Sequence, residues 1–226
     1  MGSLLRVALP HAQHASTLRH VGATLYSTAF CPYAWCTRIV LNEKRVRFRV
    51  FDVDLKAKQA EFLTVSPTSK VPVLVDGDVR IWESMAINEY LEEKYPEPNL
   101  FGTTPEERAV VRAAVIEQTW NRSQPLAKLA GMMFYQRERR DEERVHRQLR
   151  AWYRYLDELD EHFSEQAWLV LGKYTVADIC LYTTVAVSLG FGMQIGDRHC
   201  LKDWLGRMNG RESVRRSVPE SLASFA

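Results

Sequence analysis

The alternation of apolar and polar residues predicts a strand–helix–strand unit near the start of the chain. Residues 23–27 form an apolar run of strand length, and residues 33–44 contain neither Pro nor Gly, so a helix can continue through them. Residues 47–52 then alternate charged and apolar side chains, as a half-buried strand does. Two strands joined by one helix of this length make a βαβ unit with a right-handed crossover.

The pattern next predicts a short helix, a turn and a hairpin. Residues 58–65 fit one short helix, and the Ser-Pro-Thr-Ser cluster at 66–69 is typical of a turn. A strand starts at Val71, and Pro72 belongs at its start or edge because proline has no N–H for a ladder. The Asp-Gly-Asp sequence at 76–78 predicts a hairpin turn into the following strand.

In the second half of the chain, apolar residues recur at helical spacing. A long helix is predicted over 106–120; Pro125 disturbs it, because proline lacks the N–H that a helix needs, and it resumes afterwards. Residues 148–163 predict a second amphipathic helix. Thr175 and Asp178 have the spacing of a capping box, with a short acid in place of Glu, and predict the start of a core helix.

Composition changes this picture little, but it excludes several classes of function. The 226 residues are 46% apolar and 26% charged, and the formal net charge of +2 argues against nucleic acid or an anionic membrane surface as the main partner. The apolar stretches are too short for a membrane span. Four cysteines are too few for a disulfide scaffold, so a reducing compartment such as the cytoplasm is expected. The six histidines lack metal-binding spacing, so no metal is expected.

Cys31 is the residue in this pattern that most suggests chemistry. It follows the first strand and precedes Pro32, which suits the first position of a helix because its missing N–H would be unpaired there. Unpaired N–H groups and the helix dipole at such an end favour a thiolate, which predicts a Cys31 pKa of roughly 5–7. A buried, inert cysteine is the alternative interpretation.

These elements divide the chain into an α/β domain and a helical domain. Residues 1–22 hold three histidines, two arginines and no acid, and are expected to be an unstructured leader, with a weak organellar transit peptide as the alternative. Residues 23–97 are predicted to form a thioredoxin-like α/β domain. A linker at 98–105, rich in Pro and Gly, then leads into an all-helical domain at 106–226.

Several short motifs together resemble a known family. They are Phe-Cys-Pro-Tyr-Ala at 30–34, Thr-Arg-Ile-Val-Leu at 37–41, Val-Pro-Val-Leu at 71–74 and Trp-Glu-Ser-Met-Ala-Ile at 82–87. The sequence resembles the cytosolic glutathione transferases, most of all the omega class and the related cysteine-type lambda and dehydroascorbate reductase classes. The likeness is dense from Ala23 to Leu100 and looser beyond.

The resemblance implies a glutathione site around the first helix. Cys31 would be the nucleophile that faces the glutathione sulfur, with Phe30 beside it, and Lys58 would reach the glycine carboxylate. The pocket for the second substrate would draw on Tyr33, Met132 and Tyr135.

The resemblance also implies contacts to the rest of glutathione. Val71, followed by a cis Pro72, would pair its main chain with the cysteinyl part of glutathione, as an added strand does. Glu83 would hold the ammonium of the γ-glutamyl end, and Ser84 its carboxylate at the start of a helix predicted over 84–95. From the residues alone, plain helix capping is the alternative interpretation of Glu83-Ser84.

The implied function is glutathione-dependent thiol transfer or reduction, such as deglutathionylation or dehydroascorbate-type reduction, through a mixed disulfide on Cys31. Glutathione would be the co-substrate, the second substrate a small or glutathionylated molecule, and the protein a homodimer. A dehalogenase or ether-cleaving transferase is one alternative, and a non-catalytic interaction module on the same scaffold is another.

Two departures from the omega pattern stand out. Cys36 occupies a position where that class usually has Arg, and Gly is common near Ser69. Cys36 lies five residues after Cys31, about 140° further around a helix, rather than at the spacing of a redox pair. Cys36 is therefore expected to be a packing side chain.

Overall fold

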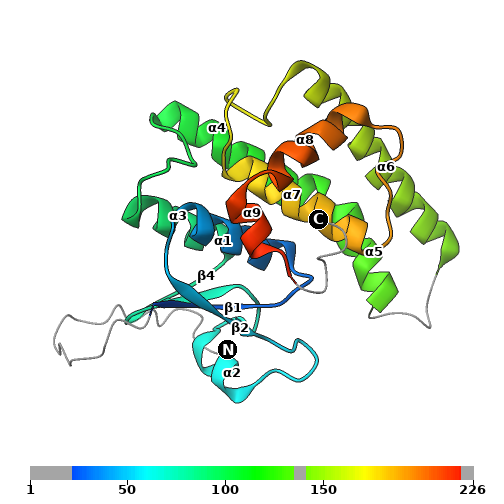
Figure 1. Cartoon of the computed structure of the whole chain (residues 1–226). Coiled ribbons are helices and arrows are strands. Elements are labelled where there is room, and N and C mark those ends of the chain that lie inside the picture. Colours follow the sequence, from blue (N-terminus) through cyan, green and yellow to red (C-terminus); the bar gives the residue numbers. More distant parts are fainter. Residues whose placement is uncertain (1–21, 135–140, 220–226) are drawn as a thin grey trace.

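The computed structural model of the protein describes residues 22–134 and 141–219, and it forms a sheet layer beside a helical layer (Figure 1). The sheet layer comes first in the chain. Its elements are β1 (Ala23–Ser27), α1 (Pro32–Glu43), β2 (Phe48–Asp52), α2 (Ala60–Val65), β3 (Val73–Asp76), β4 (Val79–Trp82) and α3 (Ser84–Lys94).

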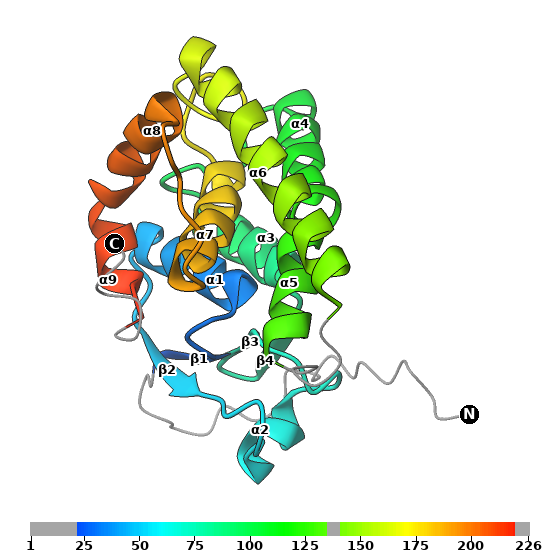
Figure 2. The same cartoon turned by 90° about the vertical axis from the view of Figure 1, so that its right-hand side faces the viewer.

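The four strands lie in the order β2-β1-β3-β4. β1 pairs parallel with β2, while β3 is antiparallel to both β1 and β4. α2 covers one face of the sheet, and α1 and α3 cover the other face (Figure 2). All five residues of β1 are buried because the strand is central and covered on both faces. This is the expected thioredoxin-like arrangement.

The helical layer packs on the α1 and α3 side of the sheet (Figures 1 and 2). α7 lies at its centre, and residues 176–188 of this helix are all buried. A helix that is apolar on every side must be surrounded by other elements. The elements are α4 (Pro105–Ile116), η1 (Glu117–Arg122), α5 (Gln124–Phe134), α6 (Glu142–Glu165), α7 (Val176–Gly190), α8 (His199–Asn209) and α9 (Glu212–Ser217).

Three elements begin two or more residues away from the predicted position. α2 begins at Ala60, two residues later than expected, and β3 begins at Val73 rather than Val71. α6 begins earlier than predicted, because Asp141 caps it by accepting a 3.2 Å hydrogen bond from the N–H of Arg144.

The disturbance predicted near Pro125 takes the form of a π-helical segment. η1 connects α4 to α5, and the N–H of Ser123 bonds the carbonyl of Gln118 at 3.2 Å, five residues back. Pro125 has no N–H to donate to the turn before it, so regular α-helix cannot continue there. π-Helical turns inside helices are frequent at functional sites.

The Thr175–Asp178 capping box is present and is tied to the rest of the helical layer. The Asp178 carboxylate accepts from the Thr175 N–H at 3.0 Å, and the Thr175 side chain caps the first turn of α7. The same carboxylate also accepts from the Leu169 N–H at 2.9 Å and from Trp204 Nε1 at 3.2 Å. The start of α7 is therefore held by a buried carboxylate that joins it to α8.

Within the described ranges, no helix is long and apolar enough to cross a membrane.

Thr175→Ala should lower the free energy of unfolding by about 1 kcal/mol, the usual cost of losing an N-cap side chain. Urea unfolding followed by circular dichroism measures it. Ser164→Ala, at an exposed site near the end of α6, is the control and should change stability by less than about 0.5 kcal/mol. Equal stability of the two variants would contradict a stabilising role for the cap.

Candidate functional site

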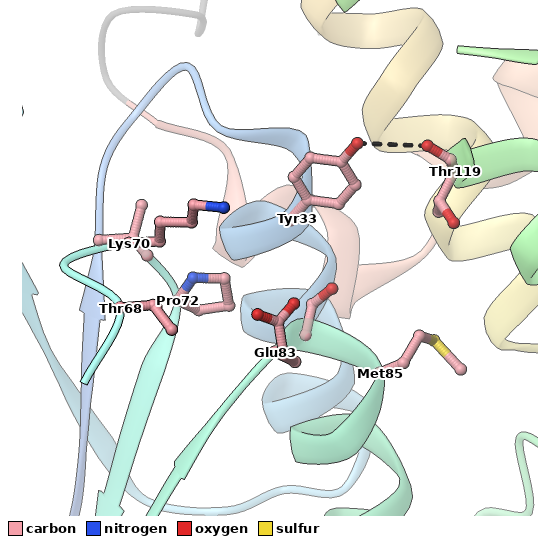
Figure 3. A pocket seen from close by; sticks show the side chains of 9 residues that line it. Tyr33, Thr68, Lys70, Pro72, Glu83, Met85 and Thr119 are labelled. Carbon is pink, nitrogen blue, oxygen red and sulfur yellow. Dashed lines mark hydrogen bonds between the residues drawn. The ribbon is translucent and has the colours of Figure 1, made fainter. Parts of the chain in front are cut away.

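A pocket of about 210 Å³ lies where the first turn of α1, the approach to β3, the start of α3 and η1 meet (Figure 3). It brings together Tyr33, Val71, Pro72, Glu83 and Ser84, five of the residues that the sequence singled out. The full lining is Tyr33, Thr68, Lys70, Val71, Pro72, Glu83, Ser84, Met85 and Thr119.

The start of α3 contributes an anion-binding end and a carboxylate. Ser84 is the first residue of the helix, and the first turn contains no acidic side chain, so its N–H groups keep their positive potential. Glu83 precedes the helix with a backbone φ of 68°, a left-handed conformation that costs a non-glycine residue roughly 1–3 kcal/mol. Figure 3 shows the Glu83 side chain between Pro72 and Met85.

The turn before β3 contributes a cation that the sequence interpretation missed. The Ser66 hydroxyl donates to the carbonyl of Lys70 at 3.0 Å and accepts from its N–H at 3.1 Å, which closes the predicted turn. Ser69 has a φ of 53°, a value that favours glycine and agrees with the glycine common near this position in the omega class. Lys70 reaches toward Tyr33 (Figure 3). The sequence feature that could have indicated Lys70 is its position directly before the Val-Pro pair at 71–72.

Val71 and Pro72 lie just before the hydrogen-bonded ladder. The β1–β3 register begins with Tyr26 opposite Val73, so Val71 lies outside the registered pairs. The Val71–Pro72 peptide bond is cis, which confirms that expectation. The main chain of Val71 therefore borders the pocket as an extension of the strand.

Tyr33 bridges the two layers at the pocket. Its hydroxyl donates to the carbonyl of Thr119 in η1 at 3.2 Å (Figure 3), and Ser123 Oγ donates to the same carbonyl at 2.7 Å. Burial raises the pKa of the Tyr33 hydroxyl, so it remains a protonated donor at neutral pH. The π-helical segment thus presents a backbone carbonyl to the first turn of α1.

Cys31 occupies the N-cap position of α1, two residues before Tyr33, but it is not among the residues that line the pocket. The residue is only partly exposed, and burial raises the pKa of its thiol. The N–H groups of Ala34 and Tyr33 and the positive charge of Arg38 lower the pKa, but they offset only part of the effect of burial. The lowered pKa expected from the helix end is therefore wrong.

The other predicted site residues lie outside this pocket or outside the described structure. Phe30 is 45% exposed and stacks on Phe191 with ring centroids 6.1 Å apart. Lys58 is exposed in the segment before α2. Met132 belongs to α5, but its side chain is not described, and Tyr135 lies outside the described residues.

No group of three or more metal-ligating side chains occurs in the part of the chain that the structure describes.

Comparison with known proteins gives matches over most of the chain. Residues 25–99 match the family model described as "Glutathione S-transferase, N-terminal domain", and residues 122–212 match "Glutathione S-transferase, C-terminal domain". "Glutathione S-transferase 1" of Dianthus caryophyllus is 34% identical over 191 residues, which are 79% of this chain and 83% of the relative.

The likeness to the omega class covers less of the chain. "Glutathione S-transferase omega-2" of Mus musculus is 35% identical over 105 residues, which are 46% of this chain and 42% of the relative. Among solved structures, "Ure2p in Complex with Glutathione" superposes with a TM-score of 0.79 at 22% identity, over 88% of this chain and 99% of that one. At this identity the superposition supports the fold alone.

The pKa of Cys31 can be measured from its alkylation. In a Cys36→Ala background without glutathione, the rate of Cys31 carboxamidomethylation by iodoacetamide should still be rising above about pH 8.5, the ordinary thiol value, because burial disfavours the thiolate. Quantifying the labelled peptide by mass spectrometry gives the rate at each pH. A plateau reached below pH 7 would show that the helix end outweighs burial.

Proposed function

The chain belongs to the glutathione S-transferase family, and from this premise we propose that the pocket between α1, α3 and η1 binds glutathione for thiol transfer by Cys31. The observation that carries the proposal is the match of charges. Glutathione has two carboxylates, one ammonium and an extended peptide, and the pocket offers a cation, a helix N-terminus, a carboxylate and a strand edge.

The γ-glutamyl end of glutathione fits the start of α3. Its carboxylate would lie against Ser84 and the N–H groups of the first turn, where a negative charge is favoured. Its ammonium would pair with the Glu83 carboxylate next to it. The strained backbone at Glu83 supports this role, because such strain clusters at functional sites.

The cysteinyl part of glutathione fits the edge at Val71. An extended peptide there would pair with the main chain of Val71 as an added strand. Tyr33 lines the same pocket, and Cys31 lies two residues before it, so the glutathione sulfur would lie near the N-terminus of α1.

The glycine end of glutathione has two candidate partners. The pocket volume is about 210 Å³, whereas complete small-molecule sites typically have volumes of about 300–1,000 Å³. Part of the tripeptide would therefore extend outside the pocket. Lys70 lines the pocket, whereas Lys58 lies beyond it on the exposed segment before α2. We propose that Lys70 makes the main charge contact and that Lys58 is an outer partner.

In the proposed reaction, the Cys31 thiolate attacks the glutathione sulfur of a glutathionylated substrate. The substrate leaves as a thiolate, and Cys31 holds glutathione in a mixed disulfide. The thiolate of a second glutathione attacks the glutathionyl sulfur, which yields oxidised glutathione and restores the Cys31 thiolate. Because burial raises the Cys31 pKa, the thiolate fraction and the rate should both rise with pH through the neutral range.

The finer features of this proposal follow the omega-like motifs around Cys31. They are reduction of small or glutathionylated disulfide substrates, a homodimer and a place in the cytoplasm, where glutathione is reduced. They rest on the sequence motifs at 30–34 and 71–74 and on the partial match to the omega class.

The raised pKa of Cys31 favours a second candidate function. A protonated Cys31 could donate a weak hydrogen bond to a glutathione thiolate, as a hydroxyl would, and so support addition of glutathione to electrophiles. The nucleophile in that reaction would be glutathione itself, and Cys31 would form no covalent bond.

Cys31→Ser separates the two functions, because serine keeps a donor and removes the nucleophilic sulfur. Under the thiol-transfer proposal, reduction of a cysteine–glutathione mixed disulfide should fall by at least about two orders of magnitude. Cys200→Ser, on α8 and outside the pocket, should leave it unchanged. The second candidate would instead be supported by two results together. Conjugation of glutathione to an aryl halide would be lost in Cys31→Ala but kept in Cys31→Ser, and Cys31→Ser would retain the reductase turnover.

Lys70→Met should weaken glutathione binding by about tenfold, equivalent to about 1.4 kcal/mol, because a charge-assisted hydrogen bond is lost from the pocket. Lys58→Met, the same chemical change outside the pocket, should weaken it by less than about threefold. Isothermal titration calorimetry with glutathione measures both. If Lys58→Met weakened glutathione binding more than Lys70→Met, the glycine carboxylate would instead be assigned to Lys58.

A further inference from the structure

Two buried cysteines meet at the boundary between the sheet layer and the helical layer. Cys36 Sγ on α1 and Cys180 Sγ on α7 are 3.1 Å apart, although 144 residues separate them in the chain. Their side chains are 2% and 4% exposed, and both thiols are free. Neither residue lines the glutathione pocket, so the pair has no part in the proposed reaction.

The surroundings make the two sulfurs unequal. Asn88 Nδ2 on α3 donates a 3.3 Å hydrogen bond to Cys36 Sγ, and Cys36 is also the partner of the Cys180 thiol. The hydrogen bond with Cys36 and burial raise the pKa of Cys180, which therefore keeps its proton. Cys36 Sγ thus has a nitrogen donor beside it in addition to the second sulfur.

We propose that Cys36 and Cys180 form a reversible disulfide that joins α1 to α7 when the protein meets a small oxidant such as hydrogen peroxide. A disulfide has an S–S distance of about 2.05 Å, so the sulfurs must approach by about 1 Å, a small shift between two packed helices. Peroxide alone supplies the oxidising equivalents, so this bond can form whether or not Cys31 transfers thiols.

The reaction balances in two steps. The Cys36 thiolate attacks one peroxide oxygen, the O–O bond breaks, and Cys36 becomes a sulfenic acid while hydroxide leaves. The Cys180 sulfur then attacks the sulfenic sulfur and forms the S–S bond, and the sulfenic oxygen leaves as water with the thiol proton. The two thiols lose two electrons, and peroxide is reduced to two waters once the hydroxide is protonated.

The cross-link would stabilise the fold across its layers. It closes a loop of 144 residues, which restricts the unfolded chain, and it fixes α1, whose N-terminus carries Cys31, against the core helix α7. Oxidation of buried thiols requires local opening, so the bond should form more slowly than the oxidation of Cys31.

The test is peptide mapping after exposure of the full chain to hydrogen peroxide, quenching with N-ethylmaleimide and digestion with trypsin. Cys36 lies in the tryptic peptide 20–38 together with Cys31, whereas Cys180 is alone in the peptide 174–198. In a Cys31→Ala variant, a joined 20–38/174–198 species can therefore arise only through Cys36. We expect that species, two hydrogens lighter than the sum of its peptides, in both wild type and Cys31→Ala, and its loss on treatment with dithiothreitol.

Matched variants and stability complete the experiment. Cys180→Ala should abolish the joined species, while Cys200→Ala should retain it. Oxidised wild type should unfold at a higher urea concentration than the reduced protein, and Cys180→Ala should show no such shift. Recovery of Cys36 and Cys180 as N-ethylmaleimide adducts after peroxide has oxidised Cys31 would overturn the proposal, as would a joined species that forms in wild type but not in Cys31→Ala.

Discussion

The packing of α1 between the sheet and α7 is the constraint on which the rest of the structure depends. Nine residues of this helix are buried, among them Trp35, whose Nε1 donates to Ser217 Oγ in α9 at 2.9 Å. At the far end of the helix, the Glu43 carboxylate accepts from Arg211 at 2.7 Å and from the hydroxyl of Tyr174 at 3.0 Å. Both layers pack against α1, so the whole fold fixes the position of its N-terminus. The same packing therefore positions Cys31.

The elements that the sequence predicts well are those encoded by neighbouring residues. Pro32 marks the start of α1, the Asp-Gly-Asp turn closes the β3–β4 hairpin, and Thr175 with Asp178 starts α7. Each of these signals depends on the dihedral angles or hydrogen bonds of a few consecutive residues, and needs no knowledge of the rest of the fold. The motifs around Val71 and Glu83 likewise single out four of the residues that line one pocket.

Properties that depend on contacts with distant elements could not be predicted from the sequence. The pKa of Cys31 has the opposite direction from the local expectation, because the helix end is visible in the sequence but the burial of the sulfur is not. The local sequence relates Cys36 only to Cys31, whereas its partner, Cys180, lies 144 residues away. The bond from Tyr33 to the Thr119 carbonyl depends on a π-helical segment, for which Pro125 was only an indirect sign.

Glu83 shows how stability and binding are opposed at this site. Glycine would relieve its φ of 68°, yet it would remove the carboxylate that borders the pocket. β4 ends at Trp82 and α3 begins at Ser84, so Glu83 alone makes the change of chain direction between them. The packed strand and helix on either side hold Glu83 in this strained conformation. That same reversal points the first-turn N–H groups of α3 and the Glu83 side chain into one small space. The proposed binding of a zwitterionic ligand end therefore depends on this strained backbone at Glu83.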